Sequence, residues 1–289
     1  MISKIIHQIS FKNKKTNYIN LSKIKENQSN DEKINMIEFN NYSAYHLSWI
    51  NKNGNWNYIQ WNEISIKKLI LKNYSFYYKY YLNIKSETLR LLFSKYIILY
   101  HYGGIYLDND FVCLKNLDGI IELYPERKLL VSSIPYINNF EQYHINKKYN
   151  LDNNLILLSD SVILCEEKNE FIGLIINKLF HNIKNNQIVI NDEEIFGSIM
   201  LSKLFYNECK KEKLYDIIPH YYFIPCFSFD NNCNPIKKSY ANKKEFLKYN
   251  KNIKKSLFYF YFNYMRYILK SSLIIFIIFF LYFIFNNIN

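Results

Sequence analysis

The chain has 289 residues, of which 49% are hydrophobic and only 21% are charged. This balance provides enough apolar side chains for a folded core and excludes a disordered chain. The net charge of +12 suggests a nucleic-acid or membrane-surface protein, but the excess is uneven. Residues 237–255 hold eight lysines and one acid, so the rest of the chain carries only about +5. We therefore expect no nucleic-acid partner.

Glycine, proline and cysteine usage excludes several further classes. Six glycines and five prolines are too few for a collagen-like, linker-like or proline-rich chain. The five cysteines form no CxxC pair and have no histidines at zinc spacing. Neither a disulfide scaffold nor a structural zinc site is expected.

Strand and helix signals alternate along the first 236 residues. Strands are predicted at 4–9, 58–61, 104–107, 129–132, 155–158 with 161–165, and 217–218, and helices at 64–72, 86–102, 169–184 and 194–212. The order predicts an α/β fold. Because no repeat or linker interrupts it, residues 1–236 are expected to form one domain.

The clearest helix signal covers residues 86–102. Its apolar residues recur at helical spacing from Leu89 to Tyr100, and Ser86 is suited to the N-cap. Gly103 ends the pattern, and Gly104 follows it. The sequence thus predicts a helix, a tight turn and a short buried strand in succession.

Two aspartates follow this strand, at the end where ligands usually bind in α/β sheets. Asp108 and Asp110 are two residues apart, so in extended backbone their carboxylates point to the same side. Such a pair suits Mg²⁺ or Mn²⁺, which prefer oxygen ligands. Asp-Asn-Asp is also an ordinary polar turn, and the motif alone leaves both interpretations open.

The residues around the aspartates resemble a known family. Leu99 to Asp118, LYHYGGIYLDNDFVCLKNLD, is similar to the DXD-containing sugar-binding region of glycosyltransferases, as in fungal initiating α-1,6-mannosyltransferases and toxin-type glucosyltransferases. Lys4–Ile9 resembles its first strand, and the stretch from Ser48-Trp49 to Trp61 its second block. Weaker matches are Ser159–Cys165 and Phe196–Ser198. The resemblance covers residues 4 to about 225 and implies a GT-A fold, a Rossmann-like mixed sheet flanked by helices.

The resemblance also implies roles for individual residues. Asp108 would contact the donor sugar and the metal, and Asp110 would ligate a Mn²⁺ or Mg²⁺ ion that holds the diphosphate of a UDP- or GDP-hexose. A divalent ion stabilises the charge that develops on the leaving diphosphate.

Five further residues are candidates for donor binding. Trp49 is a candidate for stacking on the nucleobase, although a buried core tryptophan is an equally good interpretation. His7 is a candidate for lining the nucleotide pocket, with a structural histidine as the alternative. The turn and strand beside the aspartates add Gly103, Gly104 and Tyr106.

The chain departs from the family on the helix before the motif. Relatives carry an Asp and an Arg three residues apart, with the Arg thirteen residues before the first aspartate. That register gives Leu92 and Lys95, whereas Glu87 and Arg90 have the right local spacing but come five residues too early. We favour Glu87 and Arg90 slightly for donor binding. The alternative is an exposed ion pair between them.

A second departure lies near the end of the domain. Relatives usually supply a late His or acidic metal ligand followed by a Trp, and Ser239 to Glu245 has neither. The third protein ligand is therefore missing or replaced, with Asn242 or His220 as candidates. Water can complete the shell of a magnesium or manganese ion, so activity remains compatible with this loss.

The C-terminal residues predict a membrane helix. Leu273 to Phe285 are uninterrupted apolar residues, and a span from Tyr267 includes only Lys270 as a charge. Residues 267–285 would rise about 28 Å as a helix, close to the thickness of the hydrocarbon layer. The lysine-rich, aromatic segment 237–266 before them predicts a cytoplasmic domain on a single-pass C-terminal anchor. A buried core helix or an in-plane anchor is the alternative.

The sequence therefore predicts a membrane-tethered, metal-dependent glycosyltransferase. It moves a hexose from a nucleotide-diphosphate sugar, with retention by family resemblance, to a glycan, protein or lipid acceptor that the sequence does not identify. The main alternative is a membrane-anchored pseudoenzyme that binds nucleotide-sugar or glycan without turnover. A phosphohydrolase with Asp108 as nucleophile fits less well, because its further motifs match only loosely.

Overall fold

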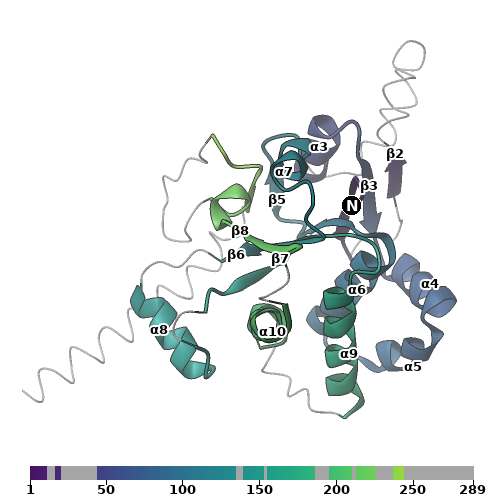
Figure 1. The fold of residues 1–289 in the computed structure, drawn as a ribbon. Coiled ribbons are helices and arrows are strands. Elements are labelled where there is room, and N and C mark those ends of the chain that lie inside the picture. The colour runs from purple at the N-terminus through teal and green to yellow at the C-terminus, as the bar shows by residue number, and fades with distance from the viewer. Residues whose placement is uncertain are drawn as a thin grey trace, which may run out of the picture. The chain divides into compact units, whose positions relative to one another are not determined.

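The computed structural model describes residues 1–11, 17–20, 44–134, 139–152, 155–185, 195–209, 213–225 and 237–243 (Figure 1). All of them belong to one compact unit, composed of Met1–Phe227 and Asn232–Lys244. This unit includes residues 237–243, which the sequence assigned to the juxtamembrane segment. The predicted membrane helix at 267–285 lies outside the described residues. Within those residues, no helix has the length and apolar character needed to cross a bilayer.

A seven-stranded mixed sheet forms the centre of the unit. Its strands lie in the order β2 (Asn17–Asn20), β3 (Asn57–Trp61), β1 (Ile5–Ile9), β4 (Gly104–Leu107), β7 (Leu158–Cys165), β6 (Leu129–Ser133) and β8 (Tyr215–Ile218). Strands β3, β1 and β4 are mutually parallel, and β7 is antiparallel to both β4 and β6. The predicted α/β class is confirmed as a mixed sheet flanked by helices.

Helices cover the sheet on both sides (Figure 1). Helices α6 (Glu87–Tyr102), α9 (Glu170–Lys184) and α10 (Met200–Leu204) lie on one side, with α4 (Glu63–Asn73) and α5 (Ser75–Asn83) beside them. Helices α3 (Ala44–Lys52) and α7 (Asp118–Leu123) lie on the other side, and α8 (Asn139–Lys148) lies near β6. Of the predicted helix at 194–212, the structure describes residues 195–209, in which α10 lies between η1 (Ile195–Ile199) and η2 (Phe205–Cys209) and the backbone is kinked at Gly197.

The predicted turn from helix to buried strand is confirmed. Ser86 caps α6 by accepting a hydrogen bond from the amide of Leu89, and Gly103 ends the helix. Gly103 and Gly104 have φ angles of +62° and +90°, where a side chain is strained. A Cβ on Gly104 would lie 2.5 Å from the carbonyl oxygen of Ile5, so glycine allows β4 to lie directly beside β1.

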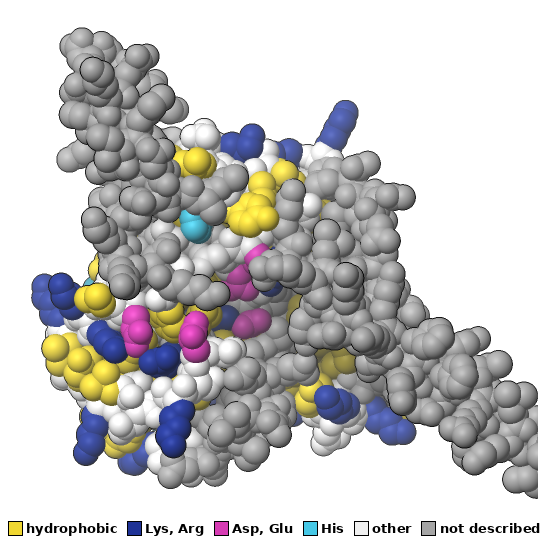
Figure 2. Space-filling view, turned by 180° about the vertical axis from the view of Figure 1, so that it is seen from behind, with side chains coloured by type: hydrophobic (Ala, Val, Ile, Leu, Met, Phe, Trp, Pro, Cys, Tyr) yellow, Lys and Arg dark blue, Asp and Glu magenta, His cyan; other side chains and the backbone are white. Residues whose placement is uncertain are grey.

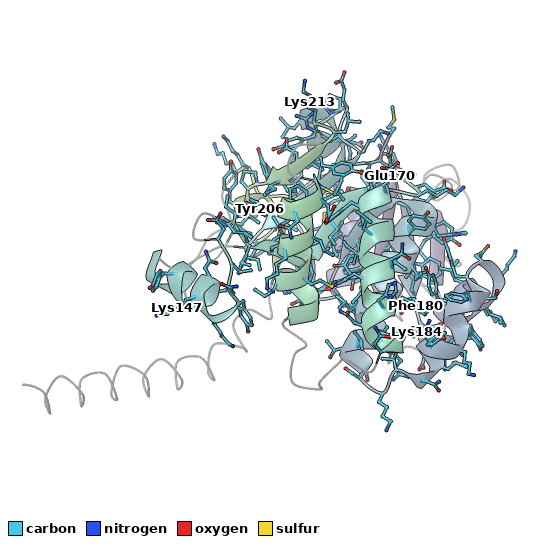
Figure 3. All side chains as sticks on the ribbon, turned by 60° about the horizontal axis from the view of Figure 1, so that its bottom comes forward. Lys147, Glu170, Phe180, Lys184, Tyr206 and Lys213 are labelled. Atoms are coloured by element: carbon cyan, nitrogen blue, oxygen red, sulfur yellow. The ribbon has the colours of Figure 1, made fainter. Side chains whose placement is uncertain are left out.

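The largest core cluster fills the space between the sheet and the helices on the α6 side. Alternate residues of the strands, such as Trp61, Tyr106 and Ile163, point into it, as the two-residue period of a strand requires. At its edge, Phe180 of α9 meets Phe76, Tyr77 and Tyr80 of α5, with ring centroids 4.9–5.1 Å apart. Figure 3 shows Phe180 toward the C-terminal end of α9, with Glu170 at its first turn.

A small second sheet extends the fold beyond the aspartates. Strand β5 (Phe111–Cys113) follows them directly and pairs antiparallel with β9 (Ala241–Lys243). Phe111 lies opposite Lys243 in this register. The pairing brings residues from the end of the described chain back to the loop that carries Asp108 and Asp110.

Charged side chains of both signs are interspersed on the face seen in Figure 2, with acidic groups gathered near its centre among hydrophobic and basic ones. A nucleic-acid footprint is a continuous basic patch or stripe. On the described part of this face, the mixture of signs does not have that pattern.

Candidate functional site

Asp108 and Asp110 lie at the C-terminal edge of β4, in a loop held from two sides. The side-chain amide of Gln8, on β1, donates to the carbonyl oxygen of Asp108 at 2.9 Å. The main-chain amide of Asp108 donates to the carbonyl oxygen of Ser161, on β7, at 3.2 Å. The Asp108 and Asp110 side chains are 29% and 14% exposed, so they are part-buried but remain open to a ligand.

The ammonium group of Lys243, on β9, lies close to both carboxylates. Its Nζ lies 3.2 Å from Oδ2 of Asp108 and 3.7 Å from Oδ2 of Asp110, and it donates to Oγ of Ser161 at 2.9 Å. Burial alone would lower the pKa of Lys243, but the adjacent carboxylates outweigh it and raise the pKa above its ordinary value. The side chain is therefore an ammonium ion at neutral pH.

A second, buried ion pair lies beside the first. Lys95, in the middle of α6, donates from Nζ to Oδ2 of Asp160 at 2.6 Å and to the carbonyl oxygen of the same residue at 2.7 Å. Ser198 donates to Oδ1 of Asp160 at 3.0 Å. Burial opposes ionisation of Asp160, but the charge of Lys95, helped by Lys243 and Ser198, lowers its pKa below the usual value. Asp160 is thus a fixed carboxylate.

Tyr106 connects the two ion pairs. Its hydroxyl donates to Oδ1 of Asp108 at 3.1 Å, and its ring centroid lies 5.6 Å from Nζ of Lys95. Burial, and then the charge of Asp108, raise the pKa of Tyr106 well above its ordinary value, so the hydroxyl keeps its proton. Three aspartates and two lysines therefore form one electrostatically connected cluster.

The sheet topology explains why these residues meet. Strand β7 is antiparallel to β4, with Val162 opposite Leu107, so the first residues of β7 lie at the end of β4. Asp160 and Ser161 are therefore placed beside the aspartate loop. Helix α6 runs back along β4, and Lys95 lies about 12 Å before the helix end, level with the carboxyl end of the strand.

His7 and Trp49, both predicted to bind donor, have side chains that are fully buried in this structure. The Nε2 atom of His7 bonds to the carbonyl oxygen of Gly103, and Nδ1 accepts from Trp61. Burial lowers the pKa of His7 to about 4, against the effect of the Gly103 carbonyl, so the ring is neutral. The Nε1 atom of Trp49 donates to the carbonyl oxygen of Phe111 at 3.0 Å. As described, both side chains support the fold and have no surface for a nucleotide.

The two predicted glycines lie away from the aspartates. Gly103 and Gly104 stand at the N-terminal end of β4, which is about 13 Å long, and Asp108 follows its other end. Tyr106, by contrast, lies within the cluster.

Glu87 and Arg90, slightly favoured from the sequence, take other positions. Arg90 pairs with Glu63 of α4 at 3.0 Å and lies over the ring of Phe11, while Glu87 is exposed on the first turn of α6. None of these contacts includes Asp108 or Asp110. Lys95, the weaker candidate from the thirteen-residue register, is the residue of α6 that meets the cluster.

Neither candidate for a third metal ligand meets the aspartates in this structure. Asn242 neighbours Lys243 on β9, so the alternation of the strand directs its side chain to the opposite face. His220 bonds from Nδ1 to the carbonyl oxygen of Ile224. In the part of the chain that the structure describes, no three His, Cys, Asp or Glu side chains are grouped so that they could hold a metal ion.

Four residues that belong to the cluster or hold it in place were absent from the predicted site: Gln8, Asp160, Ser161 and Lys243. Asp160 and Ser161 fall within the weaker match at Ser159–Cys165, which was a usable signal. Lys243 falls within the segment searched for a third ligand, but the sequence pointed there to Asn242. Only the β5–β9 register shows that residue 243 faces the site.

Comparison with known proteins finds a family model that matches this region. Residues 6–126 match the family model described as the glycosyltransferase sugar-binding region containing the DXD motif. This confirms the resemblance predicted from the residues around Asp108 and Asp110. The match includes Asp108, Asp110 and Lys95, together with helix α6 and strands β4 and β5 that position them.

The curated relatives are mannosyltransferases of Schizosaccharomyces pombe. Inositol phosphoceramide mannosyltransferase 1 is 32% identical over 66 residues, which are 23% of this chain and 21% of that protein. Inositol phosphoceramide mannosyltransferase 3 is 33% identical over 78 residues, or 27% of this chain and 22% of that protein. The matches thus span about a fifth of the length of these relatives.

A solved structure titled PaToxG Glycosyltransferase is similar at 16% sequence identity and a TM-score of 0.39. The similarity covers 72% of this chain and 70% of that one. A likeness this weak defines neither the fold nor the activity.

Proposed function

We propose that this chain is a glycosyltransferase of GT-A type that moves a hexose from a nucleotide-diphosphate sugar to an acceptor hydroxyl. The observation that carries the proposal is the convergence of Asp108 and Asp110 on one point at the carboxyl edge of β4, where Lys243 lies 3.2 and 3.7 Å from their oxygens. The position is typical of ligand sites in α/β sheets, and it falls within the matched region.

The bond between the anomeric carbon and the phosphate oxygen breaks in the proposed reaction, and its electron pair leaves with the diphosphate. The acceptor oxygen bonds to the same carbon. With retention, the leaving phosphate takes the acceptor proton on the same face, so the proposal names no protein nucleophile. The Lys243 ammonium, which the two carboxylates and Ser161 hold in place, is a preorganised cation for this charge change.

Asp160 has a separate role in this proposal. Its side chain is 27% exposed, and Lys95 holds it as a carboxylate in one orientation. A fixed carboxylate beside Asp108 is suited to accept hydrogen bonds from hydroxyl groups of the donor sugar. Lys95 is only 2% exposed and acts through Asp160 as a positioning residue.

The expected Mn²⁺ or Mg²⁺ ion does not fit the described side chains as they stand. Both candidate carboxylates face the Lys243 ammonium, and Asn242 points away from them. The proposed reaction therefore has no step through a metal, and turnover is measured with and without Mn²⁺.

The names of the curated relatives favour mannose as the sugar and a lipid as the acceptor to test first. We also propose that residues 267–285 anchor the chain in a membrane with the catalytic domain on the cytoplasmic side, on the basis of their apolar run and the preceding lysines. The full chain should then remain in the membrane fraction after extraction with alkaline carbonate.

The test is donor hydrolysis and transfer by the full chain with a panel of GDP-mannose, UDP-glucose and UDP-galactose, each with Mn²⁺ and with EDTA. The variant Asp108→Asn/Asp110→Asn should lose turnover by at least about 100-fold, because the Lys243 ammonium loses both carboxylates that hold it in position. The matched control is Glu122→Gln/Glu126→Gln, which makes the same chemical change at two exposed positions and should keep wild-type rates.

A second function, binding of a nucleotide-sugar without turnover, is favoured by one observation. Lys243 already neutralises part of the charge of both aspartates, as a binding site without a metal would require. Nucleotide binding that depends on Asp108 and Asp110, with no hydrolysis or transfer for any donor, would support this function. Absence of binding for every donor would contradict both functions.

A further inference from the structure

We propose that Lys243 is the resident cation of this site. Its ammonium group holds Asp108 and Asp110 together and excludes a divalent ion from them, and it balances the diphosphate of the donor in place of Mn²⁺ or Mg²⁺. The second half of this inference rests on the proposed function, and the first half does not.

The contacts of Lys243 are those of a bound cation. Its Nζ lies 3.2 Å from Oδ2 of Asp108, 3.7 Å from Oδ2 of Asp110 and 2.9 Å from Oγ of Ser161. These are three oxygens from two separate elements of the fold. The side chain is 17% exposed and its Nζ lies 5.3 Å from the ring centroid of Phe111, so the ammonium is partly shielded from water.

Lys243 is held in this position by the backbone. Strand β9 pairs with β5 so that Lys243 is opposite Phe111, the residue directly after Asp110. The aspartate loop and the lysine are therefore parts of one short antiparallel ladder. The ladder fixes the backbone of Lys243 beside the loop, and the hydrogen bonds to Asp108 and Ser161 hold its ammonium there, so the ammonium is a built part of the site.

A divalent ion at the same carboxylates would be repelled by this ammonium. Magnesium and manganese bind carboxylate oxygens at about 2.1 Å, so an ion on Oδ2 of Asp108 lies at most about 5 Å from Nζ of Lys243. Two like charges at that distance in a part-buried site repel strongly. The third acid of the cluster, Asp160, is paired with Lys95. That lysine compensates the charge of Asp160, which therefore does not offset the repulsion between Lys243 and an ion at Asp108.

Lysine can also supply what the proposed reaction needs from a cation. Hydrogen bonds to Asp108 and Ser161 use two of its three N–H groups among the described residues, and Oδ2 of Asp110, at 3.7 Å, lies beyond hydrogen-bond distance. The third N–H can therefore meet a phosphate oxygen. When the bond to the anomeric carbon breaks, the electron pair stays on the diphosphate and the ammonium balances it without giving up its proton. Lysine is a common phosphate-binding residue in proteins.

The first experiment measures Mn²⁺ alone, by the electron paramagnetic resonance signal of the free ion, against the full chain. The wild type should bind weakly, and Lys243→Met should bind at least ten-fold more tightly because the ammonium no longer opposes an ion at Asp108 and Asp110. Lys238→Met is the matched control, since it removes an exposed lysine five residues away, and it should bind as the wild type does. Adding Asp108→Asn/Asp110→Asn to Lys243→Met should abolish the gain in Mn²⁺ affinity.

Two checks keep this experiment decisive. Lys243→His offers a neutral imidazole ligand at the same position and should also gain Mn²⁺ affinity, so the result does not depend on one variant. Circular dichroism and thermal unfolding establish that each variant is folded. The inference is overturned if the wild type and folded Lys243→Met or Lys243→His bind Mn²⁺ within two-fold of each other.

The second experiment measures binding of GDP and UDP by calorimetry in EDTA. The wild type and Lys238→Met should bind one nucleotide without metal, and Lys243→Met should lose at least ten-fold in affinity and recover it with Mn²⁺. Nucleotide binding that requires Mn²⁺ in the wild type would overturn the second half of the inference. If neither nucleotide binds any variant, the proposed function fails, while the Mn²⁺ measurement still decides whether Lys243 excludes the metal.

Discussion

Lys95 and Asp160 are 65 positions apart in the sequence, yet Nζ of the lysine lies 2.6 Å from Oδ2 of the aspartate. The lysine side chain is 2% exposed, so this ion pair is formed with little access to water. Removing one member of such a pair leaves a buried charge without its partner. The ion pair therefore affects both the free energy of unfolding and the ionisation of Asp160 at the site.

We predict that Lys95→Met lowers the free energy of unfolding by about 3 to 5 kcal/mol at pH 7, because Asp160 is left without its cation. Urea unfolding of the full chain, followed by circular dichroism, measures this. Lys178→Met, at an exposed position of α9, is the control and should change stability by less than about 0.5 kcal/mol. A loss below about 1 kcal/mol in Lys95→Met would show that the pair is not a stabilising contact.

Tyr106→Phe should weaken the site without unfolding it. The change removes the hydrogen bond to Oδ1 of Asp108, and such bonds to charged groups contribute about 1.5 to 3 kcal/mol. Donor turnover should therefore fall by about ten-fold or more. Tyr77→Phe is the matched control, because it also removes a tyrosine hydroxyl that donates a hydrogen bond, here to Asn177 at 3.1 Å, on helices α5 and α9. Equal turnover in the two variants would refute a role for the Tyr106 hydroxyl.

Stability should depend on pH through His7. Its pKa in the fold is lowered to about 4, so the folded ring stays neutral at pH values where the unfolded chain, with the ordinary histidine pKa of about 6.5, takes up a proton. The stability contributed by this group is present above pH 6.5 and falls by about 3 kcal/mol as the pH drops to 4.

Unfolding titrations of His7→Gln at pH 4 to 7 measure that effect. The variant should show a shallower loss of stability than the wild type over this range. His181→Gln changes an exposed histidine of α9 and should follow the wild-type curve. Parallel curves for the wild type and His7→Gln would contradict the assignment of the buried, neutral ring.

Gly104→Ala should be strongly destabilising. The backbone has a φ of +90°, and the added Cβ would lie 2.5 Å from the carbonyl oxygen of Ile5, a main-chain atom that cannot move aside. We expect a loss of more than about 3 kcal/mol, measured as a lower midpoint in urea. Gly173→Ala, within helix α9, should cost far less, because alanine favours the helix and its Cβ would meet only the side chain of Tyr100. Similar midpoints for the two variants would contradict this account.

Much of the fold followed from local patterns. The apolar spacing of residues 86–102, the Ser86 cap and the two glycines predicted α6, its end and β4, and each is confirmed. These signals are local, because a cap, a helical period and a positive φ depend on residues within a few positions of one another. The acidic pair and the family resemblance followed from Leu99 to Asp118, with Lys4–Ile9 and the block from Ser48 to Trp61 in support. The resemblance was predicted for residues 4 to about 225, whereas the family model matches residues 6–126.

The remaining cluster depends on contacts between residues far apart in the sequence. Lys95 meets Asp160 because β7 runs antiparallel to β4, and Lys243 meets Asp108 because β9 pairs with β5 in one register. A shift of that register by one residue would turn Asn242 toward the aspartates and Lys243 away from them. The sequence by itself determined the α/β class, the turn and the acidic pair, whereas tertiary pairing alone decided that a lysine is the cation they face.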